Sequence, residues 1–177
     1  MNTKQLIQKC KSNNYEAQMQ VYNSYKNMMY GTAVRILKSR EEAEDIVQDC
    51  FIKAFEKISQ LKDDANLGAW LKRIVVNKSL DVVKSKHKFI ITDEFEVLEH
   101  KIEENNDDLS SGISVNFVKQ CINNLKDKYR IVLSLYLIEE YNHREIAEML
   151  NTKESTIRNQ FRRGKQQLLE MIKKQEV

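Results

Sequence analysis

Arginine and amide side chains recur along one stretch near the end of the chain, "ESTIRNQFRRGKQQLLE", at residues 154–170. In an α-helix, which turns about 100° per residue, they fall on one face. The polar donors on that face are Arg158, Asn159, Arg162, Arg163 and Gln166. Such groups suit phosphate oxygens and base edges in a DNA major groove. Basic helices are also common as plain solvated surface, so the spacing alone leaves both interpretations open.

The opposite face of this stretch is apolar and requires a packing partner. The residues within about a third of the helix circumference are Ile157, Phe161, Gly164, Leu168 and Ile172. A second helical pattern precedes it at about His143–Leu150, where Ala147 is small enough for a close helix crossing. Only the polar residues 151–153 separate the two. This arrangement predicts a helix-turn-helix, a motif that many unrelated regulators share.

The rest of the chain must also be helical to position this motif. The 177 residues include no proline and four glycines, so few residues interrupt a helix. Apolar residues recur mostly at spacings of three and four, with little strand-like alternation. We therefore predict an all-α fold. Its other expected helices cover about Thr3–Lys11, Tyr15–Leu37, Ser39 (as N-cap) to Ile58, Ala69–Ser85, and two between Ser114 and Glu140.

Charge divides the chain into three blocks. Residues 1–87 carry 15 Lys and Arg against 10 Asp and Glu, residues 88–112 carry 2 against 8, and residues 113–177 carry 12 against 8. The basic blocks suit a polyanion, because each neutralised phosphate releases counterions, but they also suit an acidic protein surface. The segment "EENNDDLSSG" is typical of a flexible linker, although the acidic strip could instead dock on a basic surface.

These observations predict two small helical domains, residues 1–88 and 114–177, joined by a flexible acidic linker at residues 89–113. The second domain contains the helix-turn-helix.

The sequence lacks the residue patterns that several classes of function need. The cysteines (Cys10, Cys50, Cys121) and histidines (His87, His100, His143) are scattered, so we predict no disulfide framework, metal site or cofactor. Phosphate-binding glycine loops and nucleophile elbows are missing from the sequence, so we predict no enzyme activity and no small-molecule substrate. No apolar run reaches the length of a membrane span, and the first residues are too polar for a secretory signal. We expect a cytoplasmic protein.

Two motif regions together resemble the bacterial extracytoplasmic-function (ECF) sigma factors of RNA polymerase. "REEAEDIVQDCFIKAFEKI" followed by "AWLKRIVVNKSLDVVKSKHK" is similar to region 2 of that family. "INNLKDKYRIVLSLYLIEEYNHREIAEMLNTKESTIRNQFRRGKQQLLE" is similar to its region 4. The order is as expected, and no room is left for the long region 3 of primary sigma factors. The resemblance implies an alternative sigma factor that binds core polymerase and reads a −35 duplex and a single-stranded −10 element.

For region 2, the resemblance implies two surfaces. The residues expected to bind the β′ clamp helices of core polymerase are Asp45, Ile46, Gln48, Asp49 and Lys53. From spacing alone, Asp45, Gln48 and Asp49 lie off the apolar stripe, which an ordinary solvated face would explain equally well. The residues expected to hold the −10 strand are Lys62, Asn66, Trp70, Arg73, Asn77, Lys78 and Lys84. By itself, Trp70 is interpreted more readily as a core residue.

For region 4, the resemblance implies contact with the −35 duplex and the β flap of polymerase. The residues expected on DNA are Arg144, Lys153, Ser155, Thr156, Arg158, Asn159, Arg162 and Arg163. The chain departs from the common family pattern at four places: Leu125–Lys126 replaces Leu-Pro, Glu140 a glycine, Asn159–Gln160 a Ser-Arg pair, and Gly164 an alanine. These changes affect the expected −35 sequence, not the fold. An anti-sigma factor is a further implied partner.

Two other classes of protein remain possible from the sequence. A helix-turn-helix regulator would bind duplex DNA without polymerase, but it leaves the region 2 motif without a role. A sigma-like adaptor would bind polymerase but not promoters. Run-off transcription with purified core polymerase distinguishes all three.

Overall fold

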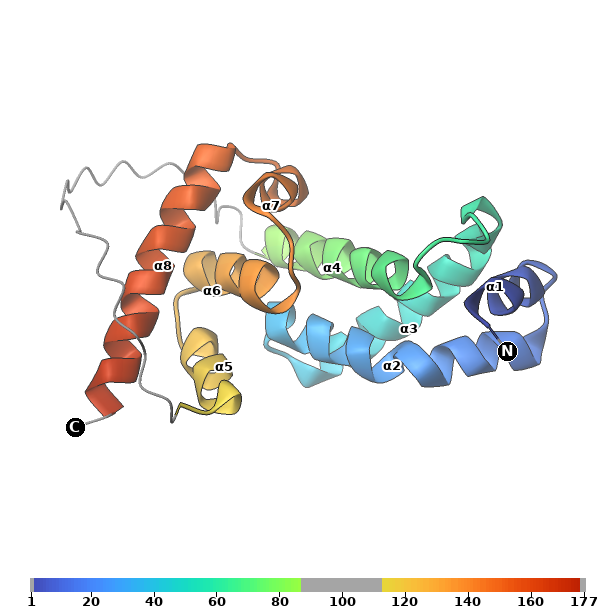
Figure 1. Ribbon diagram of the computed structural model, residues 1–177, viewed down its shortest axis with the longest axis horizontal. Coiled ribbons are helices and arrows are strands. Elements are labelled where there is room, and N and C mark those ends of the chain that lie inside the picture. Colours follow the sequence, from blue (N-terminus) through green and yellow to red (C-terminus); the bar gives the residue numbers. More distant parts are fainter. Residues whose placement is uncertain (1, 87–112, 176–177) are drawn as a thin grey trace. The chain divides into compact units, whose positions relative to one another are not determined.

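The computed structural model describes residues 2–86 and 113–175, which form two compact helical units, Met1–Lys88 and Phe89–Val177 (Figure 1). No strand occurs among these described residues, and the predicted all-α, two-domain fold class is confirmed. The linker predicted at 89–113 lies, apart from Ile113, outside the described residues. Its boundaries and its flexibility therefore remain predictions, and each unit is considered by itself below.

The described part of unit 1 contains four α-helices and one short 3₁₀ turn. They are α1 (Thr3–Lys11), α2 (Tyr15–Leu37), α3 (Arg40–Lys57), η1 (Ile58–Gln60) and α4 (Leu67–Lys86). The predicted N-cap of α3 is confirmed, because Ser39 Oγ accepts a hydrogen bond of 3.3 Å from the Glu42 amide. Glu41 and Glu42 in the first turn place negative charge at the positive end of the helix.

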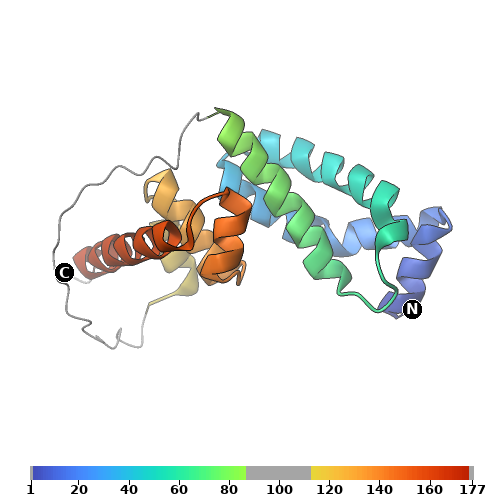
Figure 2. The same ribbon diagram turned by 90° about the horizontal axis from the view of Figure 1, so that it is seen from above.

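The core of unit 1 lies where α2, α3 and α4 pack side by side, with α1 against α2 and η1 (Figures 1 and 2). Val21, Cys50 and Leu71 are fully buried there, one from each long helix. Burial raises the pKa of the Cys50 thiol to about 11, so this cysteine is a packing residue and not a nucleophile. Cys10 and Cys121 are also buried free thiols.

Unit 2 contains α5 (Val115–Asn123), α6 (Asp127–Leu133), the π-helical turn η2 (Ser134–Ile138), α7 (His143–Leu150) and α8 (Glu154–Gln175). The sequence predicts one helix where the structure has α6 followed by η2. In that turn the Glu139 amide donates to the Ser134 carbonyl five residues back, at 3.0 Å. The spacing of apolar residues hardly distinguishes an α-helix from a π-helix here, because over a single turn the hydrogen-bond spans of the two differ by one residue.

The predicted helix-turn-helix is present as α7 and α8. Asn142 caps α7 and exchanges two hydrogen bonds of 2.9 Å with Glu145, a complete capping box. Asn151 ends α7 in the left-handed conformation, with φ of 52°. Ile146 and Ile157 are fully buried, so each helix buries one apolar face. Among the described residues, no helix is long and apolar enough to cross a membrane.

An aromatic cluster ties η2 to both helices of the motif. The Tyr136 ring lies 4.6 Å from His143 and 4.5 Å from Phe161, centroid to centroid. His143 Nε2 is buried and has no hydrogen-bond partner. Burial, and to a smaller extent the charge of Arg158, lower the pKa of His143 below its usual value. The neutral imidazole therefore packs here as a third ring.

Gly164 of α8 provides a test of how closely α8 and α6 approach. A Cβ at Gly164 would lie 3.0 Å from Tyr129 Cβ and 3.1 Å from Leu133 Cδ1. We expect Gly164→Ala to lower the free energy of unfolding of unit 2 by about 1 kcal/mol, since overpacking costs roughly 1–3 kcal/mol and helix propensity returns about 1. Urea unfolding followed by circular dichroism measures it, and Trp70 fluorescence identifies the transition of unit 1.

Gly31 of α2 is the matched control. Its added Cβ would meet only Arg35 Nη1, at 3.4 Å, so Gly31→Ala should stabilise unit 1 by about 0.5–1 kcal/mol. An equal gain at both glycines would contradict the close approach of α6 and α8.

The lowered pKa of His143 predicts a pH dependence of stability. The unfolded chain takes up the proton more readily than the folded one, so the contribution of His143 is present above its unfolded pKa and lost as the pH falls below it. We expect unit 2 to lose stability between about pH 7 and pH 5, around the ordinary histidine pKa. His143→Phe, which keeps a ring in the cluster, should flatten this dependence in urea titrations. Identical slopes would remove His143 as the cause.

Candidate nucleic-acid interface

A cavity of about 650 Å³ lies in unit 1, where the loop after η1 meets one face of α4. The residues that line it are Lys57, Gln60, Leu61, Lys62, Asp64, Ala65, Trp70, Arg73, Ile74 and Asn77. The wall combines one aromatic ring, two amides, three cations and one carboxylate. An aromatic face can stack on a base, an amide can pair with a base edge, and cations can hold a phosphate backbone.

One face of α4 supplies the residues on one side of this cavity. Trp70, Arg73, Ile74 and Asn77 stand at positions i, i+3, i+4 and i+7, which a helix brings together. The opposite face of α4, with Leu71 and Val75, is buried in the core. The helix is therefore held rigidly by one face while the other borders the cavity.

The predicted −10 residues divide into two groups. Lys62, Trp70, Arg73 and Asn77 line the cavity. The others do not: Asn66 Oδ1 accepts from the Ala69 amide at the start of α4 (3.0 Å), Lys78 is half-buried, and Lys84 lies 4.0 Å from Asp81. Trp70 also packs partly against the core, as its interpretation as a core residue predicts, and its role on the −10 strand stays a prediction.

Sequence reasoning missed several cavity residues. Ile74 could have been found, since it lies one helical turn after Trp70. The others on the far wall are Lys57, Gln60, Leu61, Asp64 and Ala65. They come from the end of α3, η1 and the following loop, whose path no periodicity predicts.

A second surface lies on α3. Asp45, Gln48, Asp49 and Lys53 are exposed there, as predicted for a partner surface. Ile46 is 8% exposed and packs in the core, so its side chain is not offered to a partner. Ile52, by contrast, is 59% exposed on the face that carries Asp49. The sequence indicates this exposure, because Ile52 is an apolar residue that lies outside the apolar stripe along the buried face of α3.

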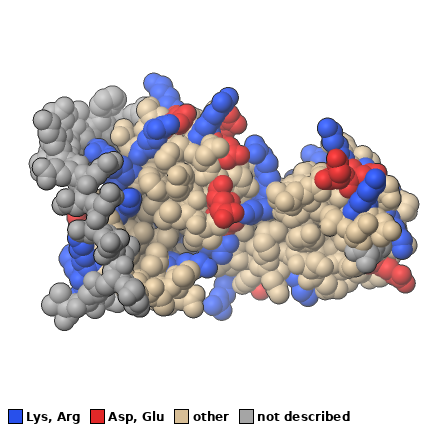
Figure 3. All heavy atoms as spheres, viewed as in Figure 1, with Lys and Arg blue, Asp and Glu red and all other residues tan. Residues whose placement is uncertain are grey.

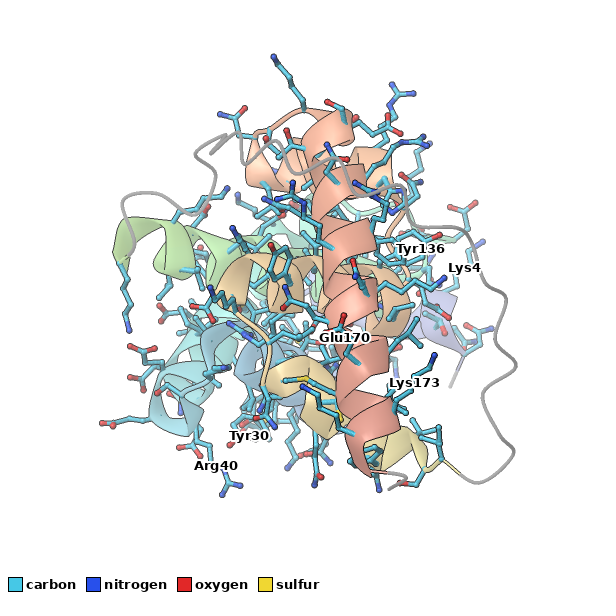
Figure 4. All side chains as sticks on the ribbon, turned by 90° about the vertical axis from the view of Figure 1, so that its left-hand side faces the viewer. Lys4, Tyr30, Arg40, Tyr136, Glu170 and Lys173 are labelled. Atoms are coloured by element: carbon cyan, nitrogen blue, oxygen red, sulfur yellow. The ribbon has the colours of Figure 1, made fainter. Side chains whose placement is uncertain are left out.

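A third surface is the outer face of the helix-turn-helix. Figure 3 shows Lys and Arg side chains around the turn between α7 and α8, and Figure 4 shows α8 lengthwise, with Tyr136 beside it and Glu170 and Lys173 in its C-terminal half. The predicted −35 residues that are exposed are Arg144, Lys153, Ser155, Arg158, Asn159 and Arg162. Thr156 and Arg163 are half-buried.

Carboxylates of the same helices contact two of these arginines. Arg158 Nη2 and Nε lie 2.6 Å and 3.0 Å from Glu154 Oε1. Arg144 Nε lies 3.5 Å from Glu148 Oε1. Both pairs are exposed and span one helical turn, so each contributes only about 0.3–0.5 kcal/mol. An anionic ligand could therefore readily displace these carboxylates from the two arginines.

Comparison with known proteins identifies both units. Residues 21–89 match the Sigma-70 region 2 family, and residues 118–168 match the Sigma-70, region 4 family. The ECF RNA polymerase sigma factor SigW of Bacillus subtilis (strain 168) is 27% identical over 183 residues, covering 98% of each chain. The ECF RNA polymerase sigma factor SigM of the same organism is 25% identical, covering 84% of this chain and 91% of the relative.

A solved structure agrees on the fold. It is the sigma factor RpoE of Bartonella quintana, crystallised with the anti-sigma factor NepR. The TM-score is 0.56 at 21% identity, over 88% of this chain and 96% of that chain. The two region families, in order along about two thirds of the chain, and ECF relatives along nearly all of it lead to one conclusion. The chain belongs to the sigma-70 family, as an ECF sigma factor that directs promoter-specific transcription initiation.

Proposed function

We propose that this sigma factor divides promoter recognition between its two units. Unit 1 attaches to core RNA polymerase through α3 and holds the single-stranded −10 element in the cavity beside α4. Unit 2 reads the −35 duplex through α8. The chain performs no covalent chemistry, which the polymerase supplies. The observation that carries the proposal is the cavity in which Trp70, Arg73 and Asn77 converge with Lys62.

The cavity supports the −10 assignment by size and chemistry. Its volume of about 650 Å³ lies within the roughly 300–1,000 Å³ typical of small-ligand pockets, so one unstacked nucleotide fits. Trp70 and Ile74 offer apolar contact to a base, and Asn77 offers both donor and acceptor to its edge. Lys62 and Arg73 can hold the adjoining phosphates.

The α8 surface supports the −35 assignment. Arg158, Asn159 and Arg162 are exposed in the first half of α8, the half that a helix-turn-helix presents to the major groove. A guanidinium can bond two acceptors of guanine at once, and an amide can do the same to adenine. Lys153 precedes the helix, where it can contact a phosphate.

The α3 surface supports the attachment to the β′ clamp helices. Exposed Asp45, Gln48 and Asp49 lie on the same face of α3 as exposed Ile52, so the surface offers polar groups beside an apolar side chain. We propose the β flap as the second polymerase contact, through unit 2. Because RpoE of Bartonella quintana was crystallised with an anti-sigma factor, we further propose an anti-sigma factor for this chain.

Run-off transcription with purified core polymerase tests the function as a whole. We expect a promoter-dependent product only when the chain is present. Core binding without a product would favour an adaptor, and duplex binding without core polymerase would favour a classical regulator.

Two arginines on α8 test the −35 assignment. We expect Arg158→Ala and Arg162→Ala each to cost about 1–3 kcal/mol of promoter binding by the holoenzyme, if each makes a bidentate base contact. Arg-to-Lys variants should lose nearly as much, because lysine keeps the charge but not the fork. Competition binding with −35 sequence variants measures this.

Lys174→Ala is the matched control, because it removes one cation about 24 Å from Arg158 and about 18 Å from Arg162 along the same helix. Losses that do not depend on the −35 sequence would reassign Arg158 and Arg162 to phosphates.

A charge reversal on α3 tests the polymerase surface. We expect Asp49→Arg to weaken core binding about tenfold, roughly 1.4 kcal/mol, because it places a cation in a surface built for the opposite charge. Fluorescence anisotropy of the labelled chain against core polymerase measures it. Glu16→Arg on α2 makes the same change of charge and should leave the affinity unchanged. Equal effects would point to general electrostatics in place of this surface.

A further inference from the structure

The cavity wall contributed by the loop between η1 and α4 is fastened at its middle by one carboxylate. Lys62 and Asp64 of this loop line the cavity, whereas Asp63 between them does not. Leu61 and Leu67, at the two ends of the loop, are buried. The ends are therefore held by the core, and the middle depends on what Asp63 contacts.

Asp63 contacts α1. Lys11 Nζ donates to Asp63 Oδ1 at 2.7 Å, and Gln8 Nε2 donates to Asp63 Oδ2 at 3.0 Å. The two donors are three residues apart on one face of the helix, so each carboxylate oxygen has its own partner. These hydrogen bonds lower the pKa of Asp63, so the carboxylate is charged at neutral pH. The Lys11 and Asp63 side chains are 27% and 35% exposed, so solvent partly screens this ion pair.

The helix that supplies these donors is itself firmly seated. Leu6, Ile7 and Cys10 of α1 are buried in the same core as Ile58 and Leu61. A complete capping box, formed by Asn2 and Gln5, begins the helix. Figure 2 shows the loop after η1 passing beside α1. α1 thus has a rigid attachment on one side and two donors to the loop on the other.

We propose that Asp63 is a positioning residue for −10 recognition, and that α1 braces the cavity wall through it. α1 precedes residues 21–89, the part that matches Sigma-70 region 2, so the half of this brace that α1 contributes lies outside the matched part. The inference rests on the proposed use of the cavity for the −10 strand. Releasing Asp63 loosens Lys62 and Asp64 together, and with them one side of the cavity.

A direct role of Lys11 on DNA is the rival explanation, and the sign of the effect separates the two. If Lys11 only held a phosphate, Lys11→Met would weaken promoter opening, while Asp63→Asn, which removes a repelling charge, would strengthen it. The brace predicts that both variants weaken opening. The exchange Lys11→Glu with Asp63→Lys should restore it, because the pair is remade with its charges reversed.

The first measurement needs neither DNA nor polymerase. Trp70 is the sole tryptophan of the chain and lines the cavity, so acrylamide quenching of its fluorescence reports how open the wall is. We expect faster quenching in Lys11→Met and Asp63→Asn, and near wild-type quenching in the exchange variant. The control is Lys9→Met, an exposed lysine on the same helix. Circular dichroism verifies that each variant is folded.

The second measurement uses holoenzyme and promoter DNA, with 2-aminopurine in the −10 element as the probe of opening. We expect both single variants to open promoter about two- to fivefold more slowly, the scale set by one partly exposed ion pair. Core affinity should be unchanged. The brace would be overturned if Lys11→Met and Asp63→Asn showed the same quenching and opening as Lys9→Met. It would also be overturned if the exchange variant did not restore the defects of the single variants. Failure of the proposed function would instead appear in the wild-type chain, as no opening that depends on the −10 sequence.

Discussion

The burial of one face of α4 between α2 and α3 is the constraint on which unit 1 depends. Leu67, Leu71 and Val75 are all at most 1% exposed on that face. Each such side chain contributes about 1.5–3 kcal/mol when it is fully buried. The face with Trp70, Arg73 and Asn77 gives up comparatively little burial, so these residues are available for contacts that folding does not use. The helical period alone thus places the residues that stabilise the fold on one face of α4 and the residues available for other contacts on another face.

The same separation governs α8. Ile157, Leu168 and Ile172 fix its inner face, and Gly164 brings it against Tyr129 and Leu133. Of the departures from the common family pattern, Gly164 lies on this inner face, whereas Asn159 is exposed on the outer one and Gln160 is half-buried. The first bears on how closely the helices approach. In the proposed −35 contact, Asn159 bears on which bases the helix prefers, because an amide bonds a base edge differently from a hydroxyl.

Sequence predicted the helices well, because their periods and caps are local. The bounds Thr3–Lys11, Tyr15–Leu37 and His143–Leu150 agree with the structure. Tertiary features were not accessible in the same way. The far wall of the cavity and the Asp63 contact with α1 each depend on which elements meet. Asn66 shows a second limit of prediction from residue type. An asparagine suits a base contact as well as a helix cap, and here it forms the cap.

Arg158 can bond either to Glu154 on its own helix or to a DNA base, and the free energies of the two contacts determine which one forms. The pair with Glu154 is exposed and contributes about 0.3–0.5 kcal/mol, whereas a bidentate contact to guanine is worth about 1–3 kcal/mol. If Arg158 makes the −35 base contact proposed above, DNA therefore wins the competition for the guanidinium once a matching base is presented. At a mismatched base the gain disappears, and the arginine stays with Glu154. The carboxylate thus lowers the affinity for every sequence slightly and gives Arg158 an alternative to non-specific phosphate contact, which favours discrimination over raw affinity.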